Sequence, residues 1–173
     1  MAKYVLGALL LASFSCAASA DETVGSWNFK VITDPMSDAV RGIASTSMSE
    51  NITIVVKCDS NGPGSIYVSL IASNYLGGVR NNYREVKYRF DGSTPAGITA
   101  YHDGRTASIL ELSPDTKGGA FLRGLAQSKE TVLQVYSYDY DSYTAVVPTT
   151  GAATAIQKVA TACRDTEWAQ LGS

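Results

Sequence analysis

The chain alternates apolar and polar residues along several short segments, and this pattern limits its fold more than any other feature. The alternation is clearest in three segments, and shorter apolar runs add three more: 27–31, 52–58 and 86–90, then 40–45, 66–71 and 108–112. Successive side chains of a β-strand point to opposite faces of a sheet, so a period of two predicts strands with one buried face. With the strands of a hairpin near 136–143 these segments give seven or eight strands, and strands at this spacing favour an antiparallel β-sandwich or an open barrel.

Two segments have a helical period instead. Apolar residues recur at three- and four-residue spacing over 155–163, and Thr150 is a suitable N-cap before them. An apolar face at Phe121 and Leu125 predicts a shorter helix over 117–127. The predicted class is therefore mainly β, with a C-terminal helix and one further short helix.

Residues 1–20 have the organisation of a secretory signal peptide. Lys3 gives the positive region, 5–12 the apolar region and Ala18-Ser19-Ala20 a small-residue cleavage site. We expect cleavage at this site, a single β-rich domain over 21–173 and a periplasmic or secreted location. The apolar run of the leader is too short to cross a bilayer and no second run of about 18 apolar residues follows, so no membrane span is expected.

The three cysteines become two once the leader is removed, because Cys16 lies within it. Cys58 and Cys163 then pair by default, since exported proteins fold in an oxidising compartment. A bridge that closes a loop of about 100 residues removes unfolded-state entropy worth roughly 4 to 5 kcal/mol. The predicted disulfide joins a strand to the apolar face of the C-terminal helix.

Charge and motif content argue against several classes of function. The 14 Lys and Arg residues are scattered among 16 Asp and Glu residues, which gives no support for a nucleic-acid partner. The single histidine lies in His102-Asp103-Gly104-Arg105, which predicts an exposed β-turn. Asp139-Tyr140-Asp141 lacks the Gly and Glu positions of an EF-hand. No catalytic residue, metal or cofactor is expected, and the chain is predicted not to be an enzyme.

Tyrosines are concentrated between positions 136 and 143. Tyr136, Tyr138 and Tyr140 are predicted to share one face of a strand, with Tyr143 just past the tip of a hairpin. Tyrosine combines a large apolar area with a hydroxyl group that tolerates water, which suits protein interfaces. The tip residues form a candidate partner-binding site: Asp139, Tyr140, Asp141 and Tyr143. The alternative is that Tyr136 and Tyr138 are core or edge-strand residues with high β-propensity.

A second segment is interpreted as structural. Asp34 directly precedes Pro35, and Asp38 follows Met36 by two positions. The two carboxylates can cap backbone amides on both sides of a turn, and this would fix how the first strand crosses into the second. We therefore assign Asp34, Pro35, Met36 and Asp38 to a structural turn.

Several of these landmarks together resemble the VasI-like periplasmic proteins. The landmarks are Trp27 before the 34–38 turn, a strand that ends at Cys58-Asp59, the strand over 86–91, and a closing helix that ends at Cys163. Proteins of this family are small exported accessory proteins encoded beside type VI secretion systems, with relatives in prophages. The resemblance implies an accessory role in the bacterial envelope.

Three functions remain open at this stage. The leading hypothesis is a non-enzymatic accessory or interaction protein with a protein partner in the cell envelope. The second is an inhibitor of a periplasmic or extracellular enzyme such as lysozyme, whose basic surface Asp139 and Asp141 would complement. The third is a glycan-binding or small-ligand-binding module that uses the tyrosines for stacking.

Overall fold

The described chain forms one antiparallel sheet of ten strands with helices on one side. The computed structural model describes residues 21–46, 51–60, 66–77 and 82–171. The strand order is β1-β2-β3-β4-β5-β8-β7-β6-β9-β10, so β1 and β10 lie at the edges. The expected leader over 1–20 falls outside the described residues.

The strands, in chain order, are β1 (Glu22–Val24), β2 (Trp27–Thr33), β3 (Val40–Thr46), β4 (Ile52–Asp59), β5 (Tyr67–Ala72), β6 (Tyr83–Phe90), β7 (Ala96–Asp103), β8 (Thr106–Ile109), β9 (Glu130–Tyr136) and β10 (Ser142–Pro148). The helices are α1 (Lys117–Gln127), α2 (Ala152–Ala162) and α3 (Thr166–Ala169). The predicted class is confirmed: the protein is mainly β, with an open antiparallel sheet, a helical C-terminal region and one disulfide.

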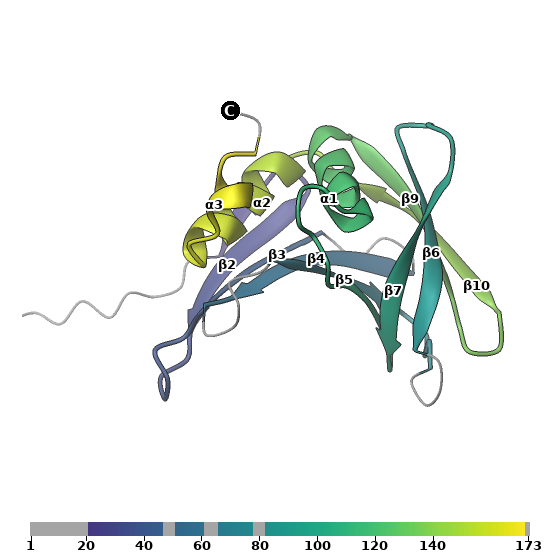
Figure 1. Ribbon diagram of the computed structural model, residues 1–173, viewed down its shortest axis with the longest axis horizontal. Helices are drawn as coiled ribbons and strands as arrows, with labels where there is room; N and C mark the ends of the chain where they lie inside the picture. The colour runs from purple at the N-terminus through teal and green to yellow at the C-terminus, as the bar shows by residue number, and fades with distance from the viewer. Residues whose placement is uncertain (1–20, 47–50, 61–65, 78–81, 172–173) are drawn as a thin grey trace, which may run out of the picture.

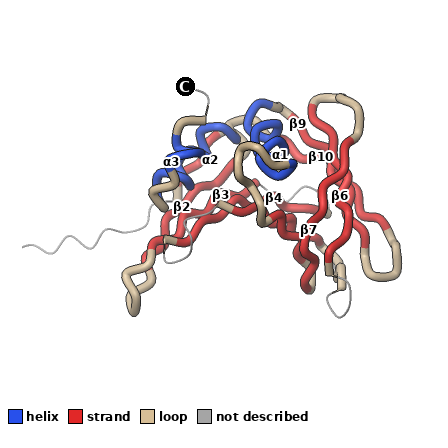
Figure 2. Tube along the Cα trace, in the orientation of Figure 1, coloured by secondary structure: helices blue, strands red, loops and turns tan. Residues whose placement is uncertain are grey.

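The sheet is curved, and the three helices lie on its concave side (Figure 1 and Figure 2). The core fills the space between this face and the helices. Ile54, Leu70 and Leu133 from the strands are fully buried, as are Phe121 of α1 and Ile156 of α2. Burying a side chain of this size stabilises the fold by about 1.5 to 3 kcal/mol, so the apolar period of two holds the helices against the sheet.

Helix α1 has the predicted bounds, and Thr116 is its N-cap. The Thr116 hydroxyl oxygen accepts a hydrogen bond of 3.0 Å from the N–H of Gly119. We expect Thr116→Ala to lower the free energy of unfolding by about 1 kcal/mol, because one N–H of the first turn loses its partner. Urea denaturation measures the loss, and a Thr116→Ser variant, which keeps the hydroxyl group, should retain most of the stability.

Helix α2 begins one residue later than predicted. Its N-cap is Gly151, with φ at 91°, and not Thr150. The backbone approaches β1 closely here, since a Cβ atom on Gly151 would lie 2.5 Å from the carbonyl oxygen of Val24. Ser26 also donates its N–H to the carbonyl oxygen of Thr150 at 2.8 Å. The β1–β2 turn therefore fixes the start of the helix, which a capping preference could not anticipate.

The predicted disulfide is present between Cys58 and Cys163. Cys58 lies in β4, and Cys163 is the C-cap residue of α2. The Cα atoms are 6.1 Å apart and the cysteines are 105 positions apart in the sequence. Both side chains are buried. The bridge links the middle of the sheet to the C-terminal helix.

The segment 34–38 forms the turn between β2 and β3. The Asp34 carboxylate accepts a hydrogen bond of 2.8 Å from the N–H of Met36. Asp38 donates its own N–H to the Asp34 carbonyl oxygen at 2.9 Å and has a φ of 55°. Pro35 and Met36 are exposed at the turn, with 93% of the Met36 surface accessible. One carboxylate and one left-handed residue thus shape the turn.

Candidate functional site

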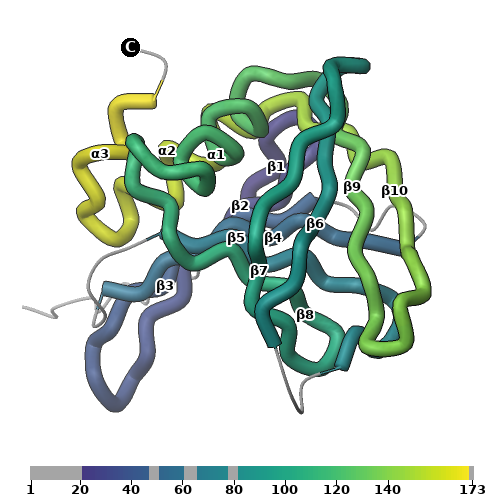
Figure 3. Tube along the Cα trace, turned by 45° about the vertical axis from the view of Figure 1, so that its right-hand side comes forward, coloured from purple at the N-terminus to yellow at the C-terminus, as the bar shows by residue number. Residues whose placement is uncertain are grey.

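Exposed tyrosines gather at one end of the sheet. Tyr75 follows β5, while Tyr138 and Tyr140 lie in the turn between β9 and β10; their exposed fractions are 53%, 60% and 86%. The rings of Tyr75 and Tyr138 meet edge to face, with centroids 6.1 Å apart. We call these three residues the tyrosine patch. In Figure 1 and Figure 3 the β9–β10 turn lies at the same end as the start of β6 and the β7–β8 turn.

Ser137 fixes the conformation of the β9–β10 turn. Its buried hydroxyl oxygen accepts hydrogen bonds from the N–H groups of Asp139 and Asp141, at 3.2 and 3.1 Å. Its N–H donates to the Asp141 carbonyl oxygen at 2.8 Å, and its carbonyl oxygen accepts from the N–H of Tyr140 at 3.2 Å. Tyr140 has a φ of 67°. The most exposed tyrosine is therefore presented on an ordered turn.

Two arginines hold the segment that carries Tyr75. Arg105, in the β7–β8 turn, donates to the carbonyl oxygens of Ala72 and Ser73. Arg84, in β6, donates from Nη2 to the carbonyl oxygen of Leu76 at 2.6 Å. The same segment meets the hairpin turn, because a Cβ atom on Gly77 would lie 2.7 Å from Cβ of Tyr138. Arg84, Arg105 and the β9–β10 turn therefore together position the segment that carries Tyr75.

Acidic side chains border the tyrosine patch. Asp139 and Asp141 are both exposed. A hydrogen bond with the Asp139 carboxylate, followed by the charge of that group, raises the pKa of Tyr138 above its ordinary value of 10.0. The Tyr138 phenol therefore stays protonated as a hydrogen-bond donor at neutral pH. The surface offers aromatic rings together with negative charge.

The other tyrosines of the predicted run occupy different environments. Tyr136 ends β9; its hydroxyl donates to Gln134 at 2.6 Å, and its ring lies 5.8 Å from Nζ of Lys87. Tyr143 is partly buried and packs on the core opposite Val135. The expectation of one shared strand face for Tyr136, Tyr138 and Tyr140 was wrong, because β9 ends at Tyr136 and the chain turns. Tyr143 does lie just past the hairpin tip as predicted, but its side chain is partly buried and packs toward the core from β10.

Sequence analysis did not identify Tyr75 as a site residue. It stands alone in Ser73-Asn74-Tyr75-Leu76-Gly77, outside the tyrosine run. One sequence feature could have identified Tyr75: it is a large aromatic residue within a segment of turn-forming residues, and residues of such segments are seldom buried. Its contact with Tyr138 depends on the sheet bringing β5 near the β9–β10 turn.

His102 is buried, so the prediction that it occupies an exposed turn was wrong. It lies in β7, one position before the strand ends, with 0% of its surface accessible. Nδ1 lies 3.1 Å from the carbonyl oxygen of Ala100. Burial, and to a smaller extent the charge of Arg84, lower the pKa of His102 below its ordinary value of 6.5. The imidazole is therefore neutral at neutral pH.

Three buried polar atoms near this histidine have no hydrogen-bond partner within the described part of the chain. They are Nε2 of His102, Nε of Arg84 and Oδ1 of Asn82. The backbone N–H of His102 donates to the Asn82 carbonyl oxygen at 2.7 Å, which aligns the two residues across β7 and the start of β6. Buried polar groups without partners are costly, so this cluster differs from ordinary core packing.

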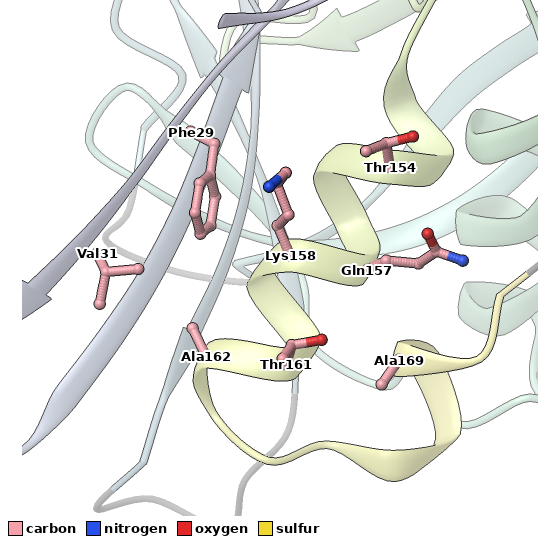
Figure 4. A pocket seen from close by; sticks show the side chains of 8 residues that line it. All are labelled: Phe29, Val31, Thr154, Gln157, Lys158, Thr161, Ala162 and Ala169. Carbon is pink, nitrogen blue, oxygen red and sulfur yellow. The ribbon is translucent and has the colours of Figure 1, made fainter. Parts of the chain in front are cut away.

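A separate open groove of about 570 Å³ lies between β2 and the helices α2 and α3 (Figure 4). Phe29 and Val31 line it from the strand, with Lys158 and Thr161 on the helix side. Nζ of Lys158 is 2.9 Å from the Glu22 carboxylate and 5.7 Å from the Phe29 ring centroid. The ammonium group of Lys158 therefore already interacts with the Glu22 carboxylate and the Phe29 ring.

Among the described residues, no group of three or more His, Cys, Asp or Glu side chains is arranged to hold a metal ion. No described helix has the length and apolar character needed to cross a membrane.

These features define a disulfide-linked antiparallel β protein with an exposed aromatic surface at one end of its sheet. Comparison with known proteins found no matching family model, no similar curated protein and no similar solved structure.

Proposed function

We propose that the protein is a non-enzymatic accessory protein of the bacterial envelope that binds another protein through the tyrosine patch. One observation carries the proposal: three large aromatic side chains are exposed together on ordered backbone. Tyr140 alone exposes 86% of its surface. Tyrosine and tryptophan are enriched among the residues that contribute most to binding at protein interfaces, because they bury much area at low cost in rotamer entropy.

The fixed geometry of the patch supports binding. Ser137 orders the turn below Tyr140, and Arg84 and Arg105 hold the segment that carries Tyr75. A surface that is ordered before it meets a partner loses less conformational entropy on association. The patch therefore has the properties of a pre-organised contact surface.

The Cys58–Cys163 disulfide supports a location outside the cytosol, because structural disulfides persist in oxidising compartments. The sequence of the leader leads to the same expectation. The resemblance to VasI-like proteins favours an accessory role beside a secretion system or in a prophage. Together these arguments favour a partner in the bacterial envelope.

A second candidate function is inhibition of a basic enzyme such as lysozyme. It is favoured by the exposed Asp139 and Asp141, which border the aromatic rings with negative charge. Complementary charge speeds association and selects partners of opposite sign. This candidate uses the same surface, so one set of variants tests both functions.

We expect the double variant Tyr75→Ser/Tyr140→Asn to lose its partner. Asn suits position 140 because it tolerates a left-handed backbone. Affinity capture from an envelope extract should recover the partner with the wild type and at least about tenfold less with the variant, since exposed tyrosines at interface centres contribute more than about 1 kcal/mol each. Mass spectrometry identifies the partner, and a lysozyme among the captured proteins would assign the inhibitor function.

The matched control is Met36→Ser/Leu110→Ser, which removes two exposed apolar side chains away from the patch; their exposed fractions are 93% and 53%. This variant should capture the partner as well as the wild type does. Equal recovery by the wild type and the tyrosine variant would remove the patch from the binding surface. A glycan array probed with both proteins tests the third function, and glycan binding that depends on the tyrosines would replace the protein partner.

A further inference from the structure

The buried cluster around His102 lies directly behind the tyrosine patch. Arg84 connects the two: its Nη2 donates to the carbonyl oxygen of Leu76, the residue after Tyr75. Burial lowers the pKa of Arg84, and the Tyr140 hydroxyl group opposes this shift to a smaller extent. The Arg84 side chain therefore lies on the same sheet face as the buried histidine and also holds the segment that carries Tyr75.

The hydrogen bonding of His102 defines its tautomer. A backbone carbonyl oxygen is only an acceptor, so Nδ1, which lies 3.1 Å from the Ala100 carbonyl oxygen, carries the proton. The lone pair is then on Nε2, which has no partner among the described residues. Nε2 is the atom that accepts a proton when the pH falls.

Within the described residues, Arg84 is the charged group that faces His102. Side chains alternate along β6 and β7, so Glu85 and Asp103 point to the opposite face of the sheet. Strand β8 carries no charged residue. Arg105, in the β7–β8 turn, is turned toward the carbonyl oxygens of Ala72 and Ser73. A proton on His102 would therefore add a second positive charge next to Arg84 with no carboxylate from these elements to balance it.

Two adjacent buried cations repel each other strongly in an environment of low dielectric constant. His102 is fully buried in a strand and cannot move away, whereas Arg84 is only partly buried. Arg84 can restore hydration by turning toward solvent. That movement breaks its hydrogen bond to the Leu76 carbonyl oxygen and frees the segment that carries Tyr75.

We propose that His102 and Arg84 form an acid-sensitive latch that holds the tyrosine patch in place at neutral pH and releases it when His102 takes up a proton. The latch itself rests on the geometry of β6 and β7; its role in controlling partner binding rests on the function proposed above. Acidification then weakens binding by loosening the surface, with no protonation of the patch itself.

The sign of the pH dependence follows from the lowered pKa of His102. The histidine of the unfolded chain binds a proton near its ordinary pKa of 6.5, and the folded protein binds one only at lower pH. Above pH 6.5 both states are neutral and the latch is closed. As the pH falls below 6.5, His102 binds a proton in the unfolded chain and in the open state before it does so in the folded, closed state. Acidification therefore lowers the stability of this end of the sheet.

Two measurements on the isolated protein test the latch. The chain has a single histidine, so its imidazole NMR signal reports His102 directly and should titrate below pH 6.5. Amide hydrogen exchange, corrected for intrinsic rates, should show protection of Leu76 and Gly77 falling by at least about tenfold between about pH 7.5 and about pH 5. Both amides donate to the Gly104 carbonyl oxygen and report on the Tyr75 segment.

Two variants assign the effect. His102→Gln is neutral at both pH values, so Leu76 and Gly77 should stay equally protected. Arg84→Met keeps an apolar stem without the charge; the pKa of His102 should then rise, and protection of Leu76 and Gly77 should be low at both pH values. Alanine is avoided at both positions because it would leave a cavity.

The latch is wrong if the wild-type imidazole titrates at or above pH 6.5, or if protection of Leu76 and Gly77 does not change with pH. It is also wrong if His102→Gln loses protection as the wild type does. The wild-type measurements decide the question even where a variant does not fold. The NMR and hydrogen-exchange measurements use the isolated protein, so they test the latch without any partner. If these measurements show the latch but the Tyr75→Ser/Tyr140→Asn variant still captures the partner, the proposed binding surface is rejected and the latch stands.

Discussion

Replacing either Cys58 or Cys163 with alanine is expected to lower the free energy of unfolding by about 4 to 5 kcal/mol. The bridge spans 105 positions of the sequence, so it removes a large share of the conformations open to the unfolded chain. A small domain has a total stability of about 5 to 15 kcal/mol, so this loss is a large fraction of it. Urea denaturation monitored by tryptophan fluorescence measures the change.

A double-mutant cycle separates the bridge from the packing of its sulfur atoms. Each single variant already breaks the bridge, so Cys58→Ala/Cys163→Ala should be only slightly less stable than either single variant. Reduction of the wild type with a thiol reagent, without mutation, should give a loss of similar size. Additive losses in the two single variants would show that packing of two buried side chains, and not the closed loop, accounts for the effect.

The strands that sequence analysis identified share one physical property. In β2, β4 and β6 most inward positions are apolar and most outward positions are polar, so a period of two is visible without any tertiary information, although Ile32 and Val55 take outward positions and Arg84 an inward one. The helix predicted over 117–127 was found with the same bounds because its apolar face, which includes Phe121 and Leu125, is the face that packs on the core. Local pattern and final packing coincide in these elements.

Strand β7 was missed because its inward positions do not form an apolar row. Ile98 and Ala100 are followed by His102 at the next inward position, where a polar side chain breaks the alternation. The turn-forming residues Asp103-Gly104-Arg105 directly follow the histidine, and they led to the prediction that it lies in an exposed turn. A polar residue placed in the core by its strand neighbours cannot be recognised from propensity, because its burial is imposed by the sheet.

The residues of the candidate site, too, were predicted correctly only where a local sequence pattern identified them. Asp139, Tyr140 and Asp141 were located at an exposed turn by their position between two predicted strands. Tyr143 was assigned to the same tip, but a difference of one residue in register reverses the face that a strand residue occupies. Tyr75 joins the patch across the sheet, and contacts between distant segments leave no local signal.

Phe121 illustrates how much of the stability depends on contacts that join the two layers. It is fully buried in α1 and meets two aromatic residues of β6, with ring centroids 4.9 Å from Tyr88 and 5.7 Å from Phe90. Tyr88 and Phe90 are themselves 5.2 Å apart. The Phe121–Tyr88 pair is edge to face, and such a pair stabilises beyond the area it buries by about 0.5 to 1.5 kcal/mol.

We expect Phe121→Ala to lower the free energy of unfolding by about 3 to 5 kcal/mol, because it removes a fully buried ring and leaves a cavity between helix and sheet. Phe121→Leu, which fills most of that space, should lose less than about 1.5 kcal/mol. Chemical denaturation of both variants with the disulfide intact measures the difference. Equal losses would mean that the layers close over the missing ring.

Tyr88 gives an independent measurement of the same contact. Burial raises the pKa of its phenol above the ordinary value of 10.0. If Phe121 is what shields this side chain from water, the pKa of Tyr88 should fall toward that value in Phe121→Ala and change less in Phe121→Leu. NMR titration with ring-labelled tyrosine follows the group directly. A pKa unchanged in Phe121→Ala, together with a full loss of stability, would show that α1 stays docked and that the cost arises from the cavity alone.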